Sequence, residues 1–325
     1  MQISVVIPTH GKVGLLRRTL ASLERQTFPF DQFEVVVVDD GSTDETPTFL
    51  AGNSGPLRLV VVRHESSRGR AAARNAGLRV AKGLVVVFLD DDMETVPGFL
   101  DAHQRFHATG PDKVGVGDVE NAPEVTDSPI VRYMSTRGAQ KIRSRGPLPW
   151  KYFSTNNSSV RREHLVRVGF FDEEFVTYGF EDLELGYRLH ARLGLTFHFV
   201  EAARSLHIHY HDIEDVLGKK FVSGRSSLAL MFRKHPETRE LLRFHRFEAP
   251  RAGDPLPLVI QTLFYRGVLV APVYHGLKSL ARFDLGVVSD RIFDFLVLYQ
   301  TLRGLAEAQS DASPAAPAQP LGSRS

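Results

Sequence analysis

The chain has 325 residues, of which 42% are hydrophobic and 24% are charged, and its formal net charge at pH 7 is +2. This balance is typical of a globular protein with a core and argues against a general nucleic-acid binder, which carries a large basic excess. The sequence contains no cysteine, which excludes disulfide scaffolds, Cys-ligated zinc or iron–sulfur sites and cysteine nucleophiles. The N-terminus lacks the basic and apolar regions of a secretory signal, which predicts a cytoplasmic protein.

Strand and helix signals alternate along the first hundred residues. Four apolar runs rich in β-branched residues predict strands, at residues 3–7, 33–38, 57–62 and 84–89. Apolar positions at helical spacing predict helices over about 15–23 and 71–81. Strands that are apolar on both faces and alternate with helices indicate an α/β fold, with a mostly parallel sheet covered by helices on both sides.

The rest of the chain divides into regions of different composition. Weak periodicity and several Arg and Lys residues predict an irregular basic loop between about residues 111 and 151. A second organised region follows, and beyond it the chain is mostly helical until an Ala-, Pro- and Ser-rich tail that we expect to be disordered. We therefore predict an α/β domain over 1–212 with halves 1–110 and 111–212, a helical region over 213–305 and a tail over 306–325.

The C-terminal helical region is apolar without containing a membrane span. Its best candidate, residues 257–274, is interrupted by Gln261 and Arg266 and so falls short of the roughly 18 uninterrupted apolar residues that a span needs. Its apolar face leaves three uses open, which are core packing, dimerisation and peripheral contact with a membrane surface. Of these, core packing is the prediction that we favour.

Acidic residues follow two of the predicted strands. Asp90, Asp91 and Asp92 come directly after the fourth strand, and Asp39 follows the second. Ligands of such sheets bind at the carboxyl ends of the strands, and adjacent carboxylates repel one another unless a cation lies between them. Oxygen ligands in this place suit Mg²⁺ or Mn²⁺ held jointly with a substrate phosphate. The alternative is a solvated acidic turn that caps a helix.

Two helix starts also have a functional and a structural interpretation. Arg70 and Arg74 lie where a helix begins, and both arginine and helix N-termini attract anions such as a diphosphate. Glu181 and Asp182 begin a later helix after aromatic and glycine residues, where a part-buried carboxylate can act as a general base. Taken alone, each pattern is more typical of a charged helix start at the surface.

Three histidines alternate along the extended segment near residue 208. His207, His209 and His211 would share one face of a strand. Imidazole together with carboxylates is a suitable ligand set for Mn²⁺. For any one of them, the structural alternative is an exposed or hydrogen-bonded histidine.

These motifs follow one another in a fixed order between about residues 3 and 210. The segments are Val5–Thr9, the turn Asp39-Asp40-Gly41-Ser42, the helix start Gly69–Asn75, Phe88–Asp92, Val168–Glu173 and Gly179–Arg188. In this order and spacing they resemble the family 2 glycosyltransferases of the GT-A fold, in which the Phe88–Asp92 segment corresponds to the DxD metal motif. The resemblance implies a GT-A Rossmann-like fold for the α/β domain.

The resemblance also implies an activity. A hexosyltransferase would move a sugar from a nucleoside diphosphate sugar, with UDP preferred, to a hydroxyl of a glycan, lipid-linked saccharide or small molecule. The transfer would be inverting and metal-dependent, in polysaccharide or cell-envelope assembly, in the cytoplasm or at the inner face of the membrane. Asp182 would be the base that deprotonates the acceptor, with Glu181 beside it.

The same resemblance assigns nucleotide-binding roles. Pro8 and Thr9 would line the nucleotide pocket, and Asp39 would accept an N–H group of the base. Arg70 or Arg74 would lie close to the base or the diphosphate. No role in binding nucleic acid is implied.

Metal binding is assigned in the same way. Asp90 would face the ribose, Asp91 would be the central member of the cluster, and Asp92 would bind Mn²⁺ or Mg²⁺. A histidine would complete the metal shell, with His207 as the first choice and His209 as the second. Two alternatives stay open, which are a retaining GT-A transferase and a binding scaffold of the same fold that has lost catalysis.

Overall fold

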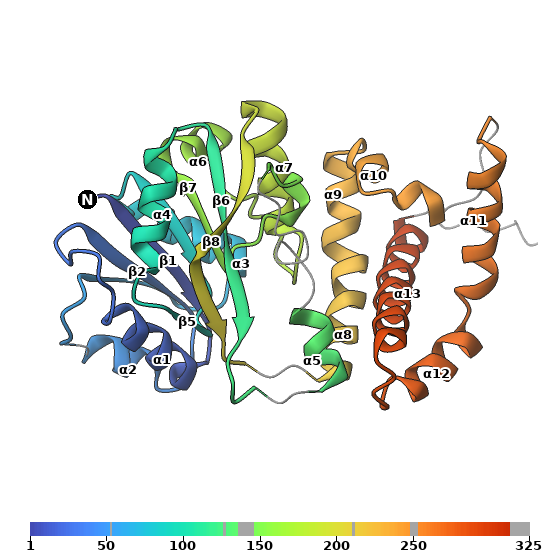
Figure 1. Cartoon of the computed structure of the whole chain (residues 1–325), viewed down its shortest axis with the longest axis horizontal. Helices are drawn as coiled ribbons and strands as arrows, with labels where there is room; N and C mark the ends of the chain where they lie inside the picture. The colour runs from blue at the N-terminus through green and yellow to red at the C-terminus, as the bar shows by residue number, and fades with distance from the viewer. Residues whose placement is uncertain (53, 126–127, 136–145, 210–211, 248–252, 313–325) are drawn as a thin grey trace, which may run out of the picture.

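A computed structural model describes the chain except residues 53, 126–127, 136–145, 210–211, 248–252 and 313–325. A sheet covered by helices makes up one part of the molecule, and a group of C-terminal helices lies beside it (Figure 1). The predicted α/β fold with a helical C-terminal extension is confirmed. The domain boundary at residue 212 stays a prediction.

The strands of the described residues form one eight-stranded sheet in the order β3-β2-β1-β4-β7-β6-β8-β5. Their bounds are β1 Ile3–Thr9, β2 Phe33–Asp40, β3 Leu59–His64, β4 Val85–Leu89, β5 Met93–Thr95, β6 Lys113–Asn121, β7 Asn157–Arg161 and β8 Thr196–His207. The first four strands of the chain pair in parallel. The other half is mixed, because β7 runs antiparallel to β4 and β6 while β8 runs parallel to β6.

Helices cover both faces of the sheet. The helices are α1 Val13–Leu23, α2 Thr46–Ala51, α3 Arg70–Val80, α4 Phe99–Ala108, α5 Pro129–Ser135, α6 Arg162–Val168, α7 Glu181–Leu193, α8 Ile213–Ser223, α9 Ala229–Lys234, α10 Thr238–Leu241, α11 Leu256–Val268, α12 Ala271–Leu280 and α13 Val287–Ala312, with short helical turns at Trp150–Tyr152, Gly224–Leu228 and Phe244–Phe247. Alternate strand residues face opposite sides, so Val6 packs toward α3, α6 and α7 while Val5 packs toward α1, α2 and α4.

The predicted irregular loop over 111–151 is wrong for two of its segments, because β6 and α5 lie within it. Strand β6 lacks the hydrophobic pattern of a strand, because glycines stand at positions 115 and 117 where one face would carry side chains. A Cβ on Gly117 would come within 2.2 Å of the side chain of Asn157 in the adjacent strand β7, so β6 needs a glycine at this position. Most of the basic part of the loop, residues 136–145, lies outside the described residues.

The C-terminal helices form a smaller apolar core of their own. Residues of α8, α12 and α13 pack together there with α5, including Val216, Leu296 and Phe293. Helix α13 continues to Ala312, so a disordered tail beginning at 306 is wrong. Residues 306–312 are mostly Ala, Glu and Gln, which favour helix, and the tail prediction took the alanines as low complexity. Within the described part of the chain, we find no helix whose length and apolar content would carry it through a bilayer.

Candidate functional site

An open pocket of about 520 Å³ lies beside the carboxyl ends of the strands, between the sheet and helices α3, α7 and α8. It gathers eight of the residues that the sequence analysis singled out: Arg70, Arg74, Asp90, Asp92, Glu181, Asp182, His207 and His209. The other four, Pro8, Thr9, Asp39 and Asp91, lie at the neighbouring strand ends, outside its lining. Residues from distant parts of the chain therefore share one site.

The acidic cluster after β4 already contains a cation from the protein. The Lys12 ammonium lies 3.0 Å from a carboxylate oxygen of Asp92 and 3.3 Å from one of Asp91. Burial raises the pKa of Asp91 to about 6, although its carboxylate also accepts a hydrogen bond of 2.7 Å from the Thr9 hydroxyl. Burial acts the same way on Asp92, but Lys12 and His207 outweigh it and lower the pKa of Asp92.

His207 is brought to Asp92 by strand pairing. It ends β8 and pairs with Met93 of β5, which places its Nε2 atom 3.7 Å from Oδ1 of Asp92. The His209 ring lies 6.4 Å from that of His207, centroid to centroid, and burial and Lys12 lower the pKa of His209. His211 lies outside the described residues.

The donor set suits a divalent ion only in part. Among the residues that the structure describes, no three His, Asp or Glu side chains lie together as a ready-made metal shell. One ionised carboxylate, from Asp92, and one imidazole, from His207, do face each other at the pocket. Both are ligand types for Mn²⁺, and phosphate oxygens of a donor would have to supply the remaining ligands.

Arg74 connects the two acidic motifs beneath the pocket. Its guanidinium donates to Asp90 and to Glu181, each at 2.9 Å, and its side chain is almost fully buried. With its charge compensated twice, Arg74 is a structural bridge, and Arg70 is the arginine of this pair with the greater freedom to meet a ligand. Glu181 is held through Oε1, while its Oε2 atom is buried without a hydrogen bond in the described structure.

Within the described structure, the carboxyl group of Asp182 differs from that of Glu181 in having no side-chain cation bound to it directly. Gly179 and Phe180, with φ of +86° and +67°, turn the chain sharply just before α7 and so place this side chain at the pocket. Desolvation and the adjacent Glu181 carboxylate raise the pKa of Asp182 to about 7, against the opposing effect of Arg74. A carboxyl with a pKa near neutrality is well matched to proton transfer at physiological pH.

The two aspartates at the end of β2, Asp39 and Asp40, have different hydrogen-bond partners. Asp39 is buried, and its Oδ1 accepts the backbone N–H of Ser42 at 2.9 Å. Its Oδ2 is buried without a hydrogen bond in the described residues, with the Arg63 Nε atom 3.4 Å away. Asp40 instead organises the loop before α3, accepting hydrogen bonds from His64, Ser67 and the backbone N–H groups of Arg68 and Gly69.

Sequence reasoning missed the cations that C-terminal helix α8 and the first loop bring to the pocket. Lys219 and Lys220 line it from α8, and Lys12 lines it from the loop after β1. Burial lowers the pKa of Lys220 in spite of the Asp182 carboxylate, which acts the other way. The signal was two adjacent lysines in the middle of a helix, and a lysine shortly after a strand end.

Tyr178 was also missed, and it joins both parts of the molecule at the pocket. The Arg70 guanidinium lies 4.6 Å from the centre of the Tyr178 ring, and the Lys219 ammonium lies 5.6 Å from it. The chain turns at the next residue, where a Cβ on Gly179 would meet the Ser223 hydroxyl of α8 at 2.9 Å. Helix α8 therefore packs directly on the loop that carries Asp182.

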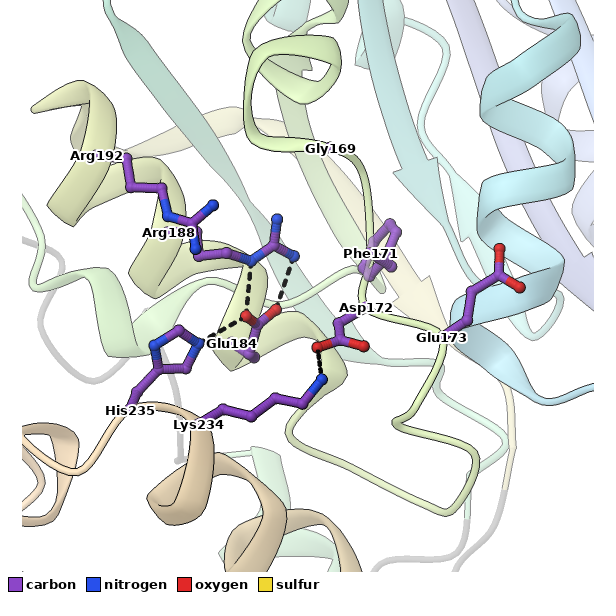
Figure 2. Close-up of a pocket in the computed structure, with 9 residues that line it drawn as sticks. All are labelled: Gly169, Phe171, Asp172, Glu173, Glu184, Arg188, Arg192, Lys234 and His235. Atoms are coloured by element: carbon purple, nitrogen blue, oxygen red, sulfur yellow. Dashed lines mark hydrogen bonds and ion pairs between the residues drawn. The ribbon is translucent and has the colours of Figure 1, made fainter.

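A second pocket, of about 570 Å³, lies on the other side of α7 (Figure 2). Figure 2 shows Arg188 and His235 converging on the Glu184 carboxylate, with Lys234 on Asp172. The Arg188 Nε and His235 Nε2 atoms lie 2.6 and 2.9 Å from Oε1 of Glu184. Because Lys234 and His235 of the C-terminal region bond to Asp172 and to Glu184 of α7, we interpret this pocket as the anchor that ties the C-terminal helices to α7.

Comparison of the sequence with known proteins gives a consistent result. Residues 4–169 match a family model described as glycosyl transferase family 2. The chain is 36% identical over 216 residues to validoxylamine A glucosyltransferase of Streptomyces hygroscopicus subsp. jinggangensis (strain 5008), with 58% of this chain and 51% of that protein aligned. It is 28% identical over 346 residues to the uncharacterized glycosyltransferase YfnE of Bacillus subtilis (strain 168), with 90% and 85% aligned. The chain thus spans about half the length of the validoxylamine A glucosyltransferases.

Solved structures resemble the fold over almost the whole chain. The mannosyltransferase PcManGT of Pyrobaculum calidifontis, in complex with GDP-Man and Mn²⁺, matches with a TM-score of 0.61 and 21% identity, covering 96% of this chain and 88% of that one. The S. aureus protein TarS, in complex with UDP-GlcNAc, matches with a TM-score of 0.53 and 19% identity, covering 95% and 92%. At this identity the likeness concerns the fold, and it confirms the expected GT-A architecture.

Proposed function

Because this chain belongs to glycosyl transferase family 2, we propose that it transfers a sugar from a nucleoside diphosphate donor to an acceptor hydroxyl. The observation that carries the proposal is the meeting of Asp90 and Asp92 with Asp182 in one pocket. The matched proteins named as glucosyltransferase and mannosyltransferase support the reaction class. The complexes with GDP-Man and UDP-GlcNAc support a nucleotide sugar as the donor.

The donor would bind along the carboxyl ends of the first strands. The buried Oδ2 of Asp39, without a hydrogen bond in the described residues, is a suitable acceptor for an N–H of the base. Pro8 and Thr9 lie at the adjacent end of β1 and would flank the nucleotide. We expect UDP as the nucleotide, with Asp90 toward the ribose and Arg70 toward the diphosphate.

Asp92 and His207 would hold Mn²⁺ or Mg²⁺ together with the donor diphosphate, with His209 as the alternative imidazole. Such an ion, when bound, neutralises negative charge that builds on the leaving diphosphate. Lys12 adds a protein cation at the same place, 3.0 Å from the Asp92 carboxylate. Asp91 would steady this arrangement through its contacts with Thr9 and Lys12.

Asp182 would act as the base. Its carboxylate takes the proton of the acceptor hydroxyl while that oxygen attacks the anomeric carbon from the face opposite to the diphosphate. The bond to the diphosphate oxygen breaks in the same displacement, so the anomeric configuration inverts. Glu181, fixed by Arg74, would keep negative charge beside the base and so keep the pKa of Asp182 high.

The acceptor is proposed only by class, as a hydroxyl of a glycan, a lipid-linked saccharide or a small molecule. The names of two relatives span this range, since one is a validoxylamine A glucosyltransferase and another is a chondroitin synthase of Escherichia coli. We place the reaction in polysaccharide or cell-envelope assembly.

Thermal unfolding with a panel of nucleoside diphosphates, with and without Mn²⁺, tests the donor site. Binding at 100 times Kd should add about 2.7 kcal/mol of stability. We expect one nucleotide to stabilise the protein in a Mn²⁺-dependent way, and Asp92→Ala to abolish that gain while the exposed Asp31→Ala control keeps it. No stabilisation by any nucleotide, in samples that unfold cooperatively, would contradict the proposal.

Turnover distinguishes the transferase from its two alternatives. An active enzyme releases nucleoside diphosphate from the donor, whereas a binding scaffold is stabilised by nucleotide without releasing it. Once an acceptor is found, proton NMR of the product reports the anomeric configuration. A retained configuration would contradict the role proposed for Asp182 in a single displacement.

A further inference from the structure

The loop before the proposed base contains a residue in a strained backbone conformation. Phe180, directly before α7, has a φ of +67°, in the left-handed region that side chains other than glycine rarely adopt. Such a conformation typically costs about 1–3 kcal/mol and persists only where the surrounding structure fixes it. Because Asp182 stands two residues further along the chain, the contacts that hold Phe180 also determine where the Asp182 carboxyl group lies.

The C-terminal helices supply contacts that hold Phe180. Its side chain packs against two apolar clusters, one that includes Met231 of α9 and one that includes Leu228. Leu228 ends a π-helical turn, Gly224–Leu228, which connects α8 to α9 without a break in the helix. Turns of this kind are rare inside helices and occur frequently at functional sites.

Two serines of the same region contact the loop directly. The buried Ser227 hydroxyl donates to the carbonyl oxygen of Tyr178 at 3.3 Å and lies 2.9 Å from the Thr177 hydroxyl. Since a serine hydroxyl has a single proton, it accepts the hydrogen bond from Thr177. Ser223 stands four residues earlier and so on the same helix face, where its hydroxyl would meet a Cβ on Gly179 at 2.9 Å.

Helix α13 keeps the π-helical turn in place. It lies against α8 and this turn (Figure 1). A Cβ on Gly224 would come within 2.1 Å of the Thr301 carbonyl oxygen, and one on Gly304 would come within 2.2 Å of the Phe221 carbonyl oxygen. The two backbones are therefore in direct contact, and a turn packed this closely is a firm support for the loop that it contacts.

We propose that Ser227 is a positioning residue for the proposed base, through which the C-terminal helices fix the place of the Asp182 carboxyl group. The inference rests on the proposed function, in which Asp182 takes the proton of the acceptor hydroxyl. Without the Ser227 hydroxyl, residues 177–180 would lose two hydrogen bonds to the π-helical turn. The strained Phe180 would then relax and move Asp182 away from the acceptor, whereas Asp39 and Asp92, which are proposed to bind the donor, lie outside this loop.

Steady-state kinetics of the full chain tests the proposal. We expect Ser227→Ala to lower kcat by about tenfold to a hundredfold, the usual cost of a misplaced reacting group, with little change in KM for the donor. The control Ser226→Ala removes a hydroxyl of the same turn that forms neither bond, and it should keep the rate.

The Thr177 side of the same hydrogen bond gives a second variant, at a part-exposed residue where a change is better tolerated. Thr177→Val keeps the shape of the side chain and should cause part of the same loss in kcat. The losses of the two single variants should not add in the double variant, because both remove one shared interaction. Thermal unfolding of each variant verifies that it is folded.

Several outcomes would overturn the proposal. They are an unchanged kcat in Ser227→Ala, an equal loss in Ser226→Ala, a change in donor KM alone, and losses from Ser227→Ala and Thr177→Val that simply add. Hydrogen exchange over residues 177–182, measured by mass spectrometry, should be faster in Ser227→Ala whether or not an acceptor is known, and unchanged exchange would also contradict the inference. A chain that transfers no sugar in its unmodified form would instead contradict the proposed function, and this inference with it.

Discussion

The sheet and the C-terminal helices use apolar residues in opposite ways. Val5 and Val6 of β1 are fully buried because helices cover both faces of the sheet. Leu256 and Phe264 of α11 are equally apolar and stay mostly exposed. Apolar residues in a sequence therefore indicate side chains that are more stable when buried. Whether other elements of the chain bury them is decided by how those elements pack.

The two parts meet at the proposed base. From the α/β part come Asp182 and its neighbours, and from the C-terminal helices come Lys220 in the pocket and Ser223 against the preceding loop. On the far side of α7, His235 bonds to Glu184. Variants in each part test this division. The transfer rate and the stability of the core should depend on the α/β part, whereas the C-terminal helices should have smaller effects on stability and on the pKa of Asp182.

The largest effect should come from Asp182→Asn, which removes the base with little change in shape. We expect the transfer rate to fall by about 10²–10⁴-fold, the usual contribution of general base catalysis. Nucleotide binding, followed by thermal unfolding, should remain, because Asp182 contacts the acceptor in our proposal. A rate within threefold of the unmodified enzyme, with Asp31→Asn as the control, would assign the base elsewhere.

The next effect should come from Arg74→Met, which breaks the bridge between Asp90 and Glu181. Removing one partner of a buried ion pair leaves its carboxylates uncompensated and typically costs about 3–5 kcal/mol of unfolding free energy. The control is Arg79→Met, because Arg79 pairs with Glu173 at the surface and should cost under about 1 kcal/mol. Urea unfolding measures both, and equal losses would show that Arg74 is not a core bridge.

A smaller effect is expected for His235→Ala, which removes one contact between the C-terminal helices and α7. Glu184 keeps both bonds to Arg188, so the loss should be about 1–2 kcal/mol in urea unfolding. The exposed His275→Ala serves as the control for removing an imidazole. If His235→Ala left stability unchanged, the second pocket would not be the anchor that we infer.

The smallest effect is a shift in pH dependence. Because Asp182 works as a carboxylate and its pKa is about 7, the transfer rate should rise with pH up to about 7 and then level off. The Lys220 ammonium favours the ionised carboxylate, so Lys220→Met should raise that pKa and move the rise to higher pH. Rates between pH 5.5 and 8.5, with the exposed Lys82→Met as the control, test this, and an unchanged or lower midpoint would contradict it.

Sequence patterns predicted the first half of the fold well because its strands are local and continuous. Each of β1, β2 and β4 is a short apolar run that can be identified from its own residues, without knowing which strands it pairs with. They failed for β6, where Gly115 and Gly117 make room for residues of β7 that lie 40 or more positions away. They also failed at 306–312, where Ala-rich composition hid the end of a helix.

The candidate site was predictable to the same extent. Asp90, Asp92 and Asp182 were found because each stands at the end or start of an element with an obvious pattern. Lys12 and Lys220 were missed, since a lysine has no periodicity that says which carboxylate it will face. Strand pairing places His207 beside Asp92, which no local pattern indicates, and the choice between His207 and His209 as a metal ligand stays a prediction.

The sequence by itself determined where the buried strands lie and that acidic residues follow them, because burial and turn formation act over a few neighbouring residues. Only the tertiary structure decided which cations meet those acids, that α8 lines the pocket, and that apolar side chains of α11 such as Leu256 stay exposed. Those outcomes depend on contacts between segments far apart in the chain, for which no local pattern exists.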